Sequence, residues 1–275
     1  MADGPIPAHG HGSACEHRQL SLCVLASGSR GNATYISDGR TAILVDAGLS
    51  GKEIQRRMAA RGLDPQALDA IVVSHEHADH IQGVGVLSRR FGLTVHINER
   101  THQASRNGLG RLTAVSPFVC GEDFAIGTLA VHPFSISHDA EDPAGFTISS
   151  NGIKVGLATD LGVVTSVVRT HLAACDILVL EANHDDRMLI DGPYPWPLKQ
   201  RIRSRSGHLS NDDAALLLQD LRHDELSHVI LAHLSEENNT AQRARETVAG
   251  VLNGAATQLH VASQADGCHL LTIGK

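Results

Sequence analysis

The chain has few aromatic residues and few cysteines. Phe, Trp and Tyr together make up 3% of its 275 residues, which disfavours an extended platform of rings for stacking the bases of a single nucleic-acid strand. Its five cysteines are scattered along the chain and include no Cys-x-x-Cys pair. This pattern is typical of a reducing compartment, and it argues against both a disulfide framework and a thiolate zinc site.

Long apolar runs are also absent, and no run reaches the roughly 20 residues that a membrane-spanning helix needs. Residues 1–18 contain Gly, Pro and His but lack the apolar segment of a secretory signal. We therefore expect a disordered lead-in over 1–18, a single domain over 19–275 and a cytoplasmic location. The net charge of −7 disfavours nucleic-acid binding driven by global charge, although it is compatible with a local basic patch.

Histidine, in contrast, is abundant, with 18 residues. Four metal-ligand side chains fall within the segment His75-Glu-His77-Ala-Asp79-His80, directly after the apolar run 70–73. His residues two apart suit an extended or looped backbone, whereas a helical zinc motif places them four apart. Since imidazole and carboxylate groups bind zinc, manganese or iron, the segment predicts a site for two adjacent divalent ions. The alternative is a polar turn with unrelated histidines.

The rest of the chain alternates strand-like and helix-like runs. The patterns predict strands over 20–26, 34–37, 41–45, 70–73, 93–97, 124–136, 145–150, 153–158, 177–181, 228–232 and 259–273. They predict helices over 52–61, 80–90, from about 98 to 107, and over 163–171, 216–221 and 240–251. We therefore expect an α/β fold with two β-rich halves, each containing helices.

Further candidate ligands stand where predicted strands end. Asp46, His138, Asp160 and His233 each follow an apolar, strand-like run. Any one of them could be a loop residue or a cap. Together they occupy the same topological place as the first motif, at strand ends where a rigid sheet can position them.

The order of these residues resembles the metallo-β-lactamase superfamily, over nearly the whole chain from Leu20. The resemblance implies an αββα sandwich with a binuclear metal site at one edge. It implies that Asp46 does not bind metal but holds a ligand histidine from behind. It implies the following ligands: His75, His77 and His138 for the first ion, Asp79, His80 and His233 for the second, and Asp160 bridging both.

Two later segments point to phosphodiester chemistry. Glu181-Ala182 and Gly207-His208 resemble segments of RNase Z, which implies a dyad in which His208 protonates the leaving oxygen and Glu181 orients it. The chemistry agrees, because a leaving alkoxide needs a proton and histidine can supply one near neutral pH. Asp79 would also help to hold the attacking water. The alternative is that His208 is a surface histidine with no catalytic role.

Longer strings look like the YycJ/WalJ family. They are Leu25-Ala-Ser-Gly-Ser-Arg-Gly-Asn-Ala-Thr-Tyr35, His233-Leu-Ser-Glu-Glu-Asn-Asn239, and the segments 137–140, 181–185, 194–195 and 207–211. This resemblance implies a 5′-to-3′ exonuclease acting on duplex DNA, with a role in DNA repair. Other readings stay open: a hydrolase of small or cyclic phosphodiesters, an RNA-processing nuclease, or a non-catalytic regulatory module.

A local basic segment lies between the two dyad residues. Residues 199–205 contain four cations, just after Pro193-Tyr-Pro-Trp-Pro197. We hypothesise that the segment grips the DNA end through phosphate contacts and that its tryptophan stacks on a base. The alternative is a solvated helix with that tryptophan docked in the core. The candidate substrate-contacting residues are Ser29, Asn32, His184, Trp196, Lys199, Arg201 and Arg203, of which Ser29, Asn32 and His184 have equally plausible turn or capping roles.

Overall fold

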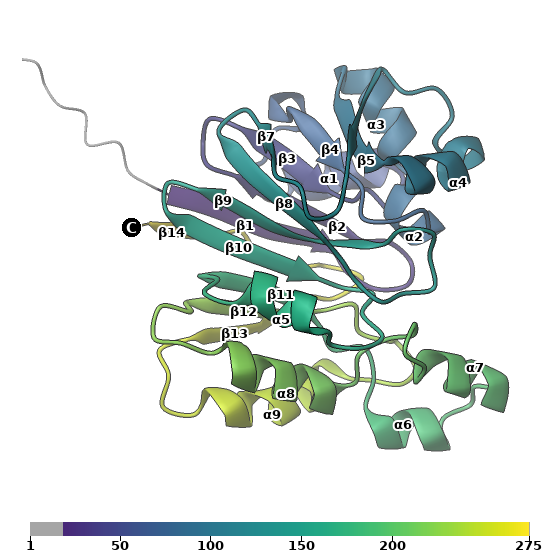
Figure 1. The fold of residues 1–275 in the computed structure, drawn as a ribbon, viewed down its shortest axis with the longest axis vertical. Helices are drawn as coiled ribbons and strands as arrows, with labels where there is room; N and C mark the ends of the chain where they lie inside the picture. Colours follow the sequence, from purple (N-terminus) through teal and green to yellow (C-terminus); the bar gives the residue numbers. More distant parts are fainter. Residues whose placement is uncertain (1–18, 275) are drawn as a thin grey trace, which may run out of the picture.

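The computed structural model describes residues 19–274, so the expected disordered lead-in over 1–18 lies outside the described residues. Two seven-stranded sheets face each other, and helices cover their outer faces (Figure 1). This confirms the expected αββα sandwich. Across residues 19–274, no helix has the length and apolar character required to cross a bilayer.

The first sheet has the strand order β14-β1-β2-β3-β4-β5-β6. Its strands are β1 (Gln19–Ala26), β2 (Ala33–Ser37), β3 (Ala42–Val45), β4 (Ala70–Val72), β5 (Thr94–Asn98), β6 (Ala114–Phe118) and β14 (Leu271–Gly274). Strands β2 and β3 pair antiparallel, and β3 to β6 run parallel. The helices on its outer side are α1 (Gly51–Ala59), α2 (Ala78–Ile81), α3 (Val84–Phe91) and α4 (Glu99–Leu109), with a short 3-10 turn, η1 (Pro65–Ala67).

The second sheet has the order β13-β12-β11-β10-β9-β8-β7. Its strands are β7 (Phe124–Ile126), β8 (Leu129–Ser135), β9 (Ala144–Ser150), β10 (Ile153–Ala158), β11 (Ile177–Glu181), β12 (His228–Ala232) and β13 (Gln258–Val261). Strands β10 to β13 run parallel. Its outer face is covered by α5 (Ser166–Leu172), α8 (Asn211–Leu221) and α9 (Ala241–Ala249), which leads into the 3-10 turn η2 (Gly250–Leu252).

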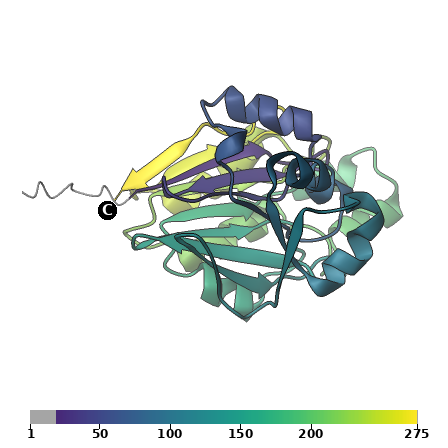
Figure 2. The ribbon, with the colours of Figure 1, turned by 90° about the horizontal axis from the view of Figure 1, so that it is seen from above.

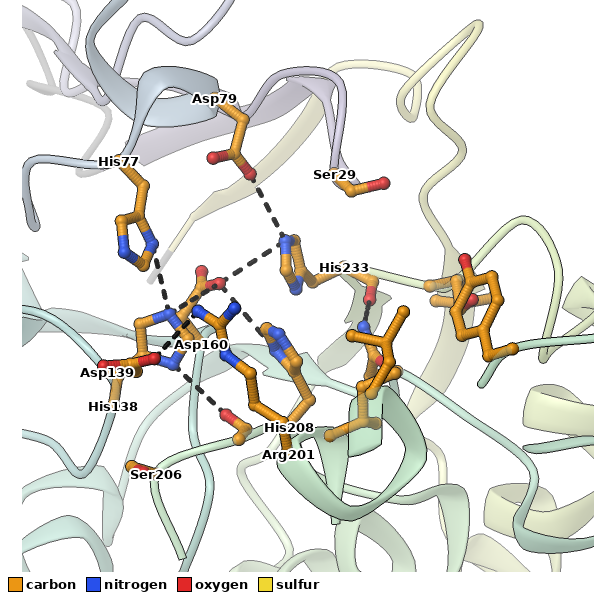
Figure 3. Close-up of a pocket in the computed structure, with 17 residues that line it drawn as sticks. Ser29, His77, Asp79, His138, Asp139, Asp160, Arg201, Ser206, His208 and His233 are labelled. Carbon is orange, nitrogen blue, oxygen red and sulfur yellow. Dashed lines mark hydrogen bonds and ion pairs between the residues drawn. The ribbon is translucent and has the colours of Figure 1, made fainter. Parts of the chain in front are cut away.

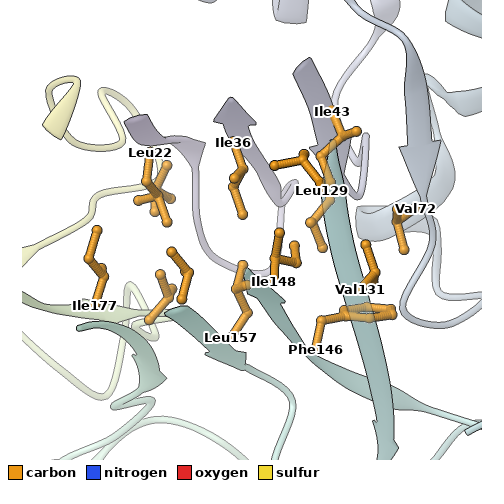
Figure 4. Packing of buried hydrophobic residues seen from close by; sticks show 14 of the residues in the cluster. Leu22, Ile36, Ile43, Val72, Leu129, Val131, Phe146, Ile148, Leu157 and Ile177 are labelled. Atoms are coloured by element: carbon orange, nitrogen blue, oxygen red, sulfur yellow. The ribbon is translucent and has the colours of Figure 1, made fainter. Parts of the chain in front are cut away.

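The main hydrophobic core lies between the two sheets. Leu22 and Ile36 of the first sheet face Ile148 and Leu157 of the second (Figure 4), and all four side chains are buried. Strand side chains alternate between the two faces of a sheet, so the remaining apolar positions pack under the helices. Figure 2 shows the same two sheets stacked face to face from above. The core therefore fixes the position of the two sheets relative to each other. The strand ends at their common edge are fixed with them.

Three predicted elements are divided in the structure. The helix expected over 80–90 is broken into α2 and α3 at Gly83, where an added Cβ would lie 2.3 Å from the Leu49 carbonyl oxygen. The strand expected over 124–136 is the hairpin of β7 and β8. The prediction of a single strand over 259–273 is wrong. This part of the chain contains two strands, of which β13 belongs to the second sheet and β14 to the first. Apolar patterns mark these segments as extended but do not say which sheet each one joins.

Two short helices lie beyond the ends of the second sheet, between β11 and α8. They are α6 (Asp186–Asp191) and α7 (Trp196–Ile202), seen at the lower right of Figure 1. The hypothesised basic segment therefore begins on a helix, as the alternative reading of that segment expected. This α6–α7 arm stands next to the edge where the candidate ligands gather.

Candidate metal centre and active site

The candidate site lies where strands of both sheets end. Asp46 follows β3 and the first metal motif follows β4, while Asp160 and His233 follow β10 and β12 of the other sheet. The carboxyl ends of parallel strands meet at one edge, where ligand sites of α/β proteins commonly form. Residues far apart in the sequence are thus brought into one cluster.

Three of these residues have left-handed backbone conformations. Asp46, Asp160 and His233 have φ values of 60°, 57° and 56°. Such values are uncommon for residues other than glycine, and they concentrate at functional sites, where the surroundings stabilise them. At His233, the N–H donates to Ser27 Oγ at 2.6 Å, and the carbonyl accepts from Asn183 Nδ2 at 2.8 Å. Neither supporting residue was predicted to act in this way, because the contacts join distant loops.

The first ligand group is three histidines. His75, His77 and His138 offer nitrogens that all lie within 4.8 Å of one another. His77 Nδ1 lies 3.1 Å from His75 Nε2 and 3.3 Å from His138 Nε2. Three imidazole nitrogens converging on one point form a common zinc-type ligand set.

The second group is Asp79, His80 and His233. Asp79 Oδ2 lies 3.6 Å from His80 Nε2 and 3.8 Å from His233 Nε2. Asp160 stands between the groups, with Oδ2 at 3.2 Å from His80 Nε2 and Oδ1 at 3.7 Å from His138 Nε2. Asp160 is therefore within reach of both groups of candidate ligands.

The donor atoms fit a pair of cations. Asp160 Oδ2 and His233 Nε2 are buried and make no well-formed hydrogen bond among the described residues, although Asp160 Oδ2 lies 3.2 Å from His80 Nε2 and His233 Nε2 lies 3.4 Å from Asp160 Oδ1. Burial alone would raise the pKa of Asp160, but the neighbouring His233 and His80 charges hold it well below its usual range. Buried polar atoms that lack partners cost free energy unless a ligand satisfies them. The all-nitrogen and oxygen set suits zinc, manganese or iron.

Asp46 supports the ligand His80 from behind. Its Oδ2 accepts hydrogen bonds from His80 Nδ1 at 2.8 Å and from Ser74 Oγ at 2.7 Å, and its Oδ1 accepts from Ser74 N at 2.8 Å. A carboxylate on Nδ1 fixes the tautomer of the ring and leaves Nε2 for a metal. Asp46 and Ser74 thus hold the His80 ring in a fixed orientation, with Nε2 near Asp79 and Asp160.

Glu181 is fully buried and saturated with hydrogen bonds. Its Oε1 accepts from His208 Nδ1 at 2.9 Å and from His233 Nδ1 at 2.8 Å, while Oε2 accepts from the backbone N–H of Leu161 and Leu209 at 2.6 and 3.1 Å. Burial alone would raise its pKa, but the charges and hydrogen bonds of the two histidines lower the pKa to about 2. Glu181 therefore positions two imidazoles and has no free oxygen for a metal.

A cleft of about 300 Å³ opens over the cluster (Figure 3). Asp79, His138, Asp160, His208 and His233 all reach it, so the expected ligands and the expected acid share one surface. His208 directs Nδ1 to Glu181 and has a 22% exposed side chain. Its other nitrogen is thereby left free at the cleft, as a proton donor requires.

The residues of the α6–α7 arm have different surroundings. Arg201 lines the cleft and pairs with Asp139 at 2.8 Å, whereas Arg203 lies near Asp186 at 3.6 Å, outside the cleft. Lys199 is buried, and its Nζ donates to the carbonyls of Ile190 and Gly192 at 2.6 and 2.8 Å. Lys199 therefore joins α6 to α7. The prediction that it belongs to a surface patch that contacts phosphate is wrong.

Trp196 does not match the alternative reading made from the sequence, in which it docks in the core. Its side chain is 58% exposed, so the hypothesis that it docks in the core is wrong. It also lies outside the lining of the cleft, which includes Tyr194 instead. The sequence does not distinguish these two aromatic residues, since the orientation of the helix decides which of them lines the cleft.

The other three candidate substrate-contacting residues, Ser29, Asn32 and His184, also differ in their surroundings. Ser29 lines the cleft. Asn32 is buried, and its Nδ2 lies 3.2 Å from Asp79 Oδ2, so it holds a ligand rather than facing a substrate. His184 is buried behind the cleft wall, where its carbonyl accepts from Asn211 N at 2.9 Å, while Asn183 takes the lining position.

Comparison with known proteins agrees with this geometry. Residues 41–234 match the family model of the beta-lactamase superfamily domain. The fold resembles that of YhfI from Bacillus subtilis, with a TM-score of 0.70 at 15% identity over 93% of this chain and 100% of that one. It also resembles the short form of human tRNase Z, with a TM-score of 0.64 at 16% identity over 91% and 98% of the chains.

Two curated relatives are similar over most of their length. Exodeoxyribonuclease YycJ of Bacillus anthracis is 39% identical over 249 residues, which cover 88% of this chain and 94% of that protein. Exodeoxyribonuclease WalJ of Streptococcus pneumoniae (serotype 2) is 40% identical over 233 residues, covering 83% and 87%. With its ligand cluster at the shared sheet edge, the chain belongs to the metallo-β-lactamase superfamily, as a metallo-hydrolase of the YycJ/WalJ family.

Proposed function

We propose that the protein is a metal-dependent exonuclease that degrades duplex DNA in the 5′-to-3′ direction. The observation that carries the proposal is the Glu181–His208 pair at 2.9 Å beside the ligand cluster. A proton donor held next to a metal site suits the hydrolysis of a phosphodiester, whose leaving alkoxide needs a proton. The chain also spans 94% and 87% of two relatives that are named exodeoxyribonucleases.

The reaction adds one water across a phosphorus–oxygen bond of the DNA backbone. Two bound ions would supply an activated water and offset the charge on the phosphate oxygens. His208 gives its proton to the leaving oxygen, and Glu181 holds the ring in the orientation that presents Nε2. Asp79 is a candidate metal ligand that also lines the cleft. There it helps to orient the attacking water.

The surface around the cleft offers a path for the rest of the strand. A second hollow of about 410 Å³ shares Ser29 and Asp79 with the cleft and includes Arg30 and Gln82. The DNA chain can thus extend to both sides of the metals, and Arg201, which pairs with Asp139, lines the cleft as a cation for a phosphate. Phosphate contacts of this kind position a nucleic acid without reading its sequence.

A gel assay on purified, manganese-loaded protein tests the proposal. The substrate is duplex DNA with a 5′-phosphate and a 3′ label on one strand, and bis-p-nitrophenyl phosphate is run alongside. A ladder of progressively shorter 3′-labelled products is expected, and Asp79→Asn should produce none. Intact DNA with rapid release of nitrophenol would instead favour a hydrolase of small phosphodiesters. Cleavage of RNA but not DNA under the same conditions would favour an RNA-processing nuclease.

A further inference from the structure

The cleft-facing side of α7 carries an aromatic ring at its start. Tyr194, which is half-buried, precedes the helix and lines the cleft together with Leu198, Arg201 and Ile202. The last three are spaced by three and four residues, which places them on one face of the helix. This face therefore presents one ring, two aliphatic side chains and one cation to the metals.

The opposite side of α7 surrounds a different hollow, of about 390 Å³. It is lined by Ile190, Trp196, Lys199, Gln200 and Arg203. Trp196 and Arg203 line this other hollow and not the cleft over the metals. Trp196 thus provides an aromatic comparison for Tyr194 on the same helix.

The backbone holds Tyr194 in place. Pro193 and Pro195 flank it, and each proline fixes its own φ near −65°. A residue before proline is also confined to extended conformations. Lys199 ties α7 to the end of α6 through two hydrogen bonds. A ring fixed in this way loses little conformational freedom when a ligand stacks on it.

We propose that Tyr194 stacks on the base of the terminal nucleotide, and that this nucleotide must be unpaired to bind. This inference rests on the proposed nuclease function. Every base has a π-face, so stacking on a single ring positions any nucleotide without sequence preference. Arg201, on the same face of α7, supplies the cation for the adjoining phosphate.

The proposed requirement for an unpaired terminal base follows from the size of the cleft. At about 300 Å³, it lies at the low end of the range for small-molecule pockets, roughly 300–1,000 Å³. A space of this size suits one nucleotide, and a base that stacks on Tyr194 enters it more readily without its paired partner. The terminal base therefore leaves its partner before cleavage, and unpairing is easiest at a mismatched or frayed end.

Fluorescence of 2-aminopurine at the 5′ terminus tests the stacking directly. The probe is duplex DNA whose first linkage is a non-hydrolysable phosphonate, mixed with manganese-loaded protein. Binding should quench the fluorescence of the wild type and of Tyr194→Phe. Tyr194→Leu should lose the quenching and bind about tenfold more weakly. The matched control Trp196→Leu should behave like the wild type.

Cleavage rates provide the second measurement. Wild-type protein should cut a duplex with a 5′-terminal mismatch faster than a fully paired one, and Tyr194→Leu should lose most of its activity on both. Unchanged quenching in Tyr194→Leu, or equal wild-type rates on the two ends, would overturn the inference while DNA cleavage itself persists. Absence of wild-type cleavage and binding on both ends would overturn the proposed function and this inference together.

Discussion

At the scale of single residues, the site is organised by which imidazole nitrogen meets a carboxylate. His80 donates a hydrogen bond from Nδ1 to Asp46. His208 and His233 both donate hydrogen bonds from Nδ1 to Glu181. In each ring the carboxylate fixes the tautomer and leaves Nε2 for a metal or a substrate. One buried residue, Glu181, thereby contacts both the candidate metal ligand His233 and the proposed acid His208.

Because Glu181 contacts both His208 and His233, substitutions of His208 and of Glu181 should have different effects. We expect His208→Gln to lower kcat by about 10²- to 10⁴-fold, the range for loss of a general acid, with bound metal unchanged. Glu181→Gln should lower kcat and also weaken metal binding by about 10- to 100-fold, because His233 loses its support. Turnover and metal content by mass spectrometry measure both effects.

His102→Gln is the control for this pair, since His102 on α4 lines neither hollow of the site. It should change neither turnover nor metal content. Loss of metal from His208→Gln would identify His208 as a ligand and remove it as the acid.

At the scale of elements, the positions of strands followed from the sequence more readily than those of short helices. The strand ends that carry Asp46, Asp160 and His233 were predicted, because each follows an apolar run that is visible locally. The α6–α7 arm was not predicted as two helices. Its orientation depends on the hydrogen bonds of Lys199 to carbonyls of the preceding helix, which no local pattern reveals.

We expect Lys199→Met to loosen this arm. Loss of two hydrogen bonds from a buried ammonium should reduce local stability by about 1–3 kcal/mol. Hydrogen exchange over residues 186–205 should rise, and KM for DNA should rise more than KM for bis-p-nitrophenyl phosphate. Lys52→Met, at an exposed position of α1, is the control. Unaltered exchange over 186–205 would show that the arm is held by other contacts.

The turn between β2 and β3 gives a pH-dependent contribution to stability. Asp38 accepts hydrogen bonds from the N–H groups of Arg40 and Thr41 and from Ser150 Oγ, at 2.9, 2.9 and 2.7 Å. Burial opposes ionisation, but these hydrogen bonds and one from Thr128 lower the pKa from 3.8 to about 2. The stabilisation is therefore complete above pH 4 and is lost as the pH falls towards 2.

Asp38→Asn should accordingly be less stable than the wild type above pH 4, by about 1–3 kcal/mol, and similar to it near pH 2. Urea unfolding at a series of pH values measures the difference. Asp224→Asn, at an exposed position, is the control. A constant difference between Asp38→Asn and the wild type at all pH values would contradict the assignment.

At the scale of the whole molecule, an acidic chain is proposed to bind a polyanion. The net charge is −7, so attraction must come from local cations such as those of the α6–α7 arm. Each phosphate contact contributes about −0.9 to the slope of log affinity against log salt concentration. Binding should therefore depend on salt through a few contacts only.

Substituting Arg201 and Arg203 together by glutamine should weaken DNA binding and reduce the magnitude of the salt slope by about one to two. Fluorescence anisotropy at several salt concentrations measures both quantities. Arg90→Gln, on the exposed side of α3, is the control. If affinity and slope stay unchanged in the double variant, the arm does not contact phosphate.

The sequence by itself determined the fold class and the candidate ligands. Strand-forming runs and the residues that end them are local features, and metal-binding side chains are recognisable from their type and spacing. Only the tertiary structure decided that Glu181 joins His233 to His208, that Lys199 is buried, and that Tyr194 rather than Trp196 lines the cleft. These outcomes depend on packing between segments far apart in the chain and on the rotation of one short helix, and no local pattern encodes either.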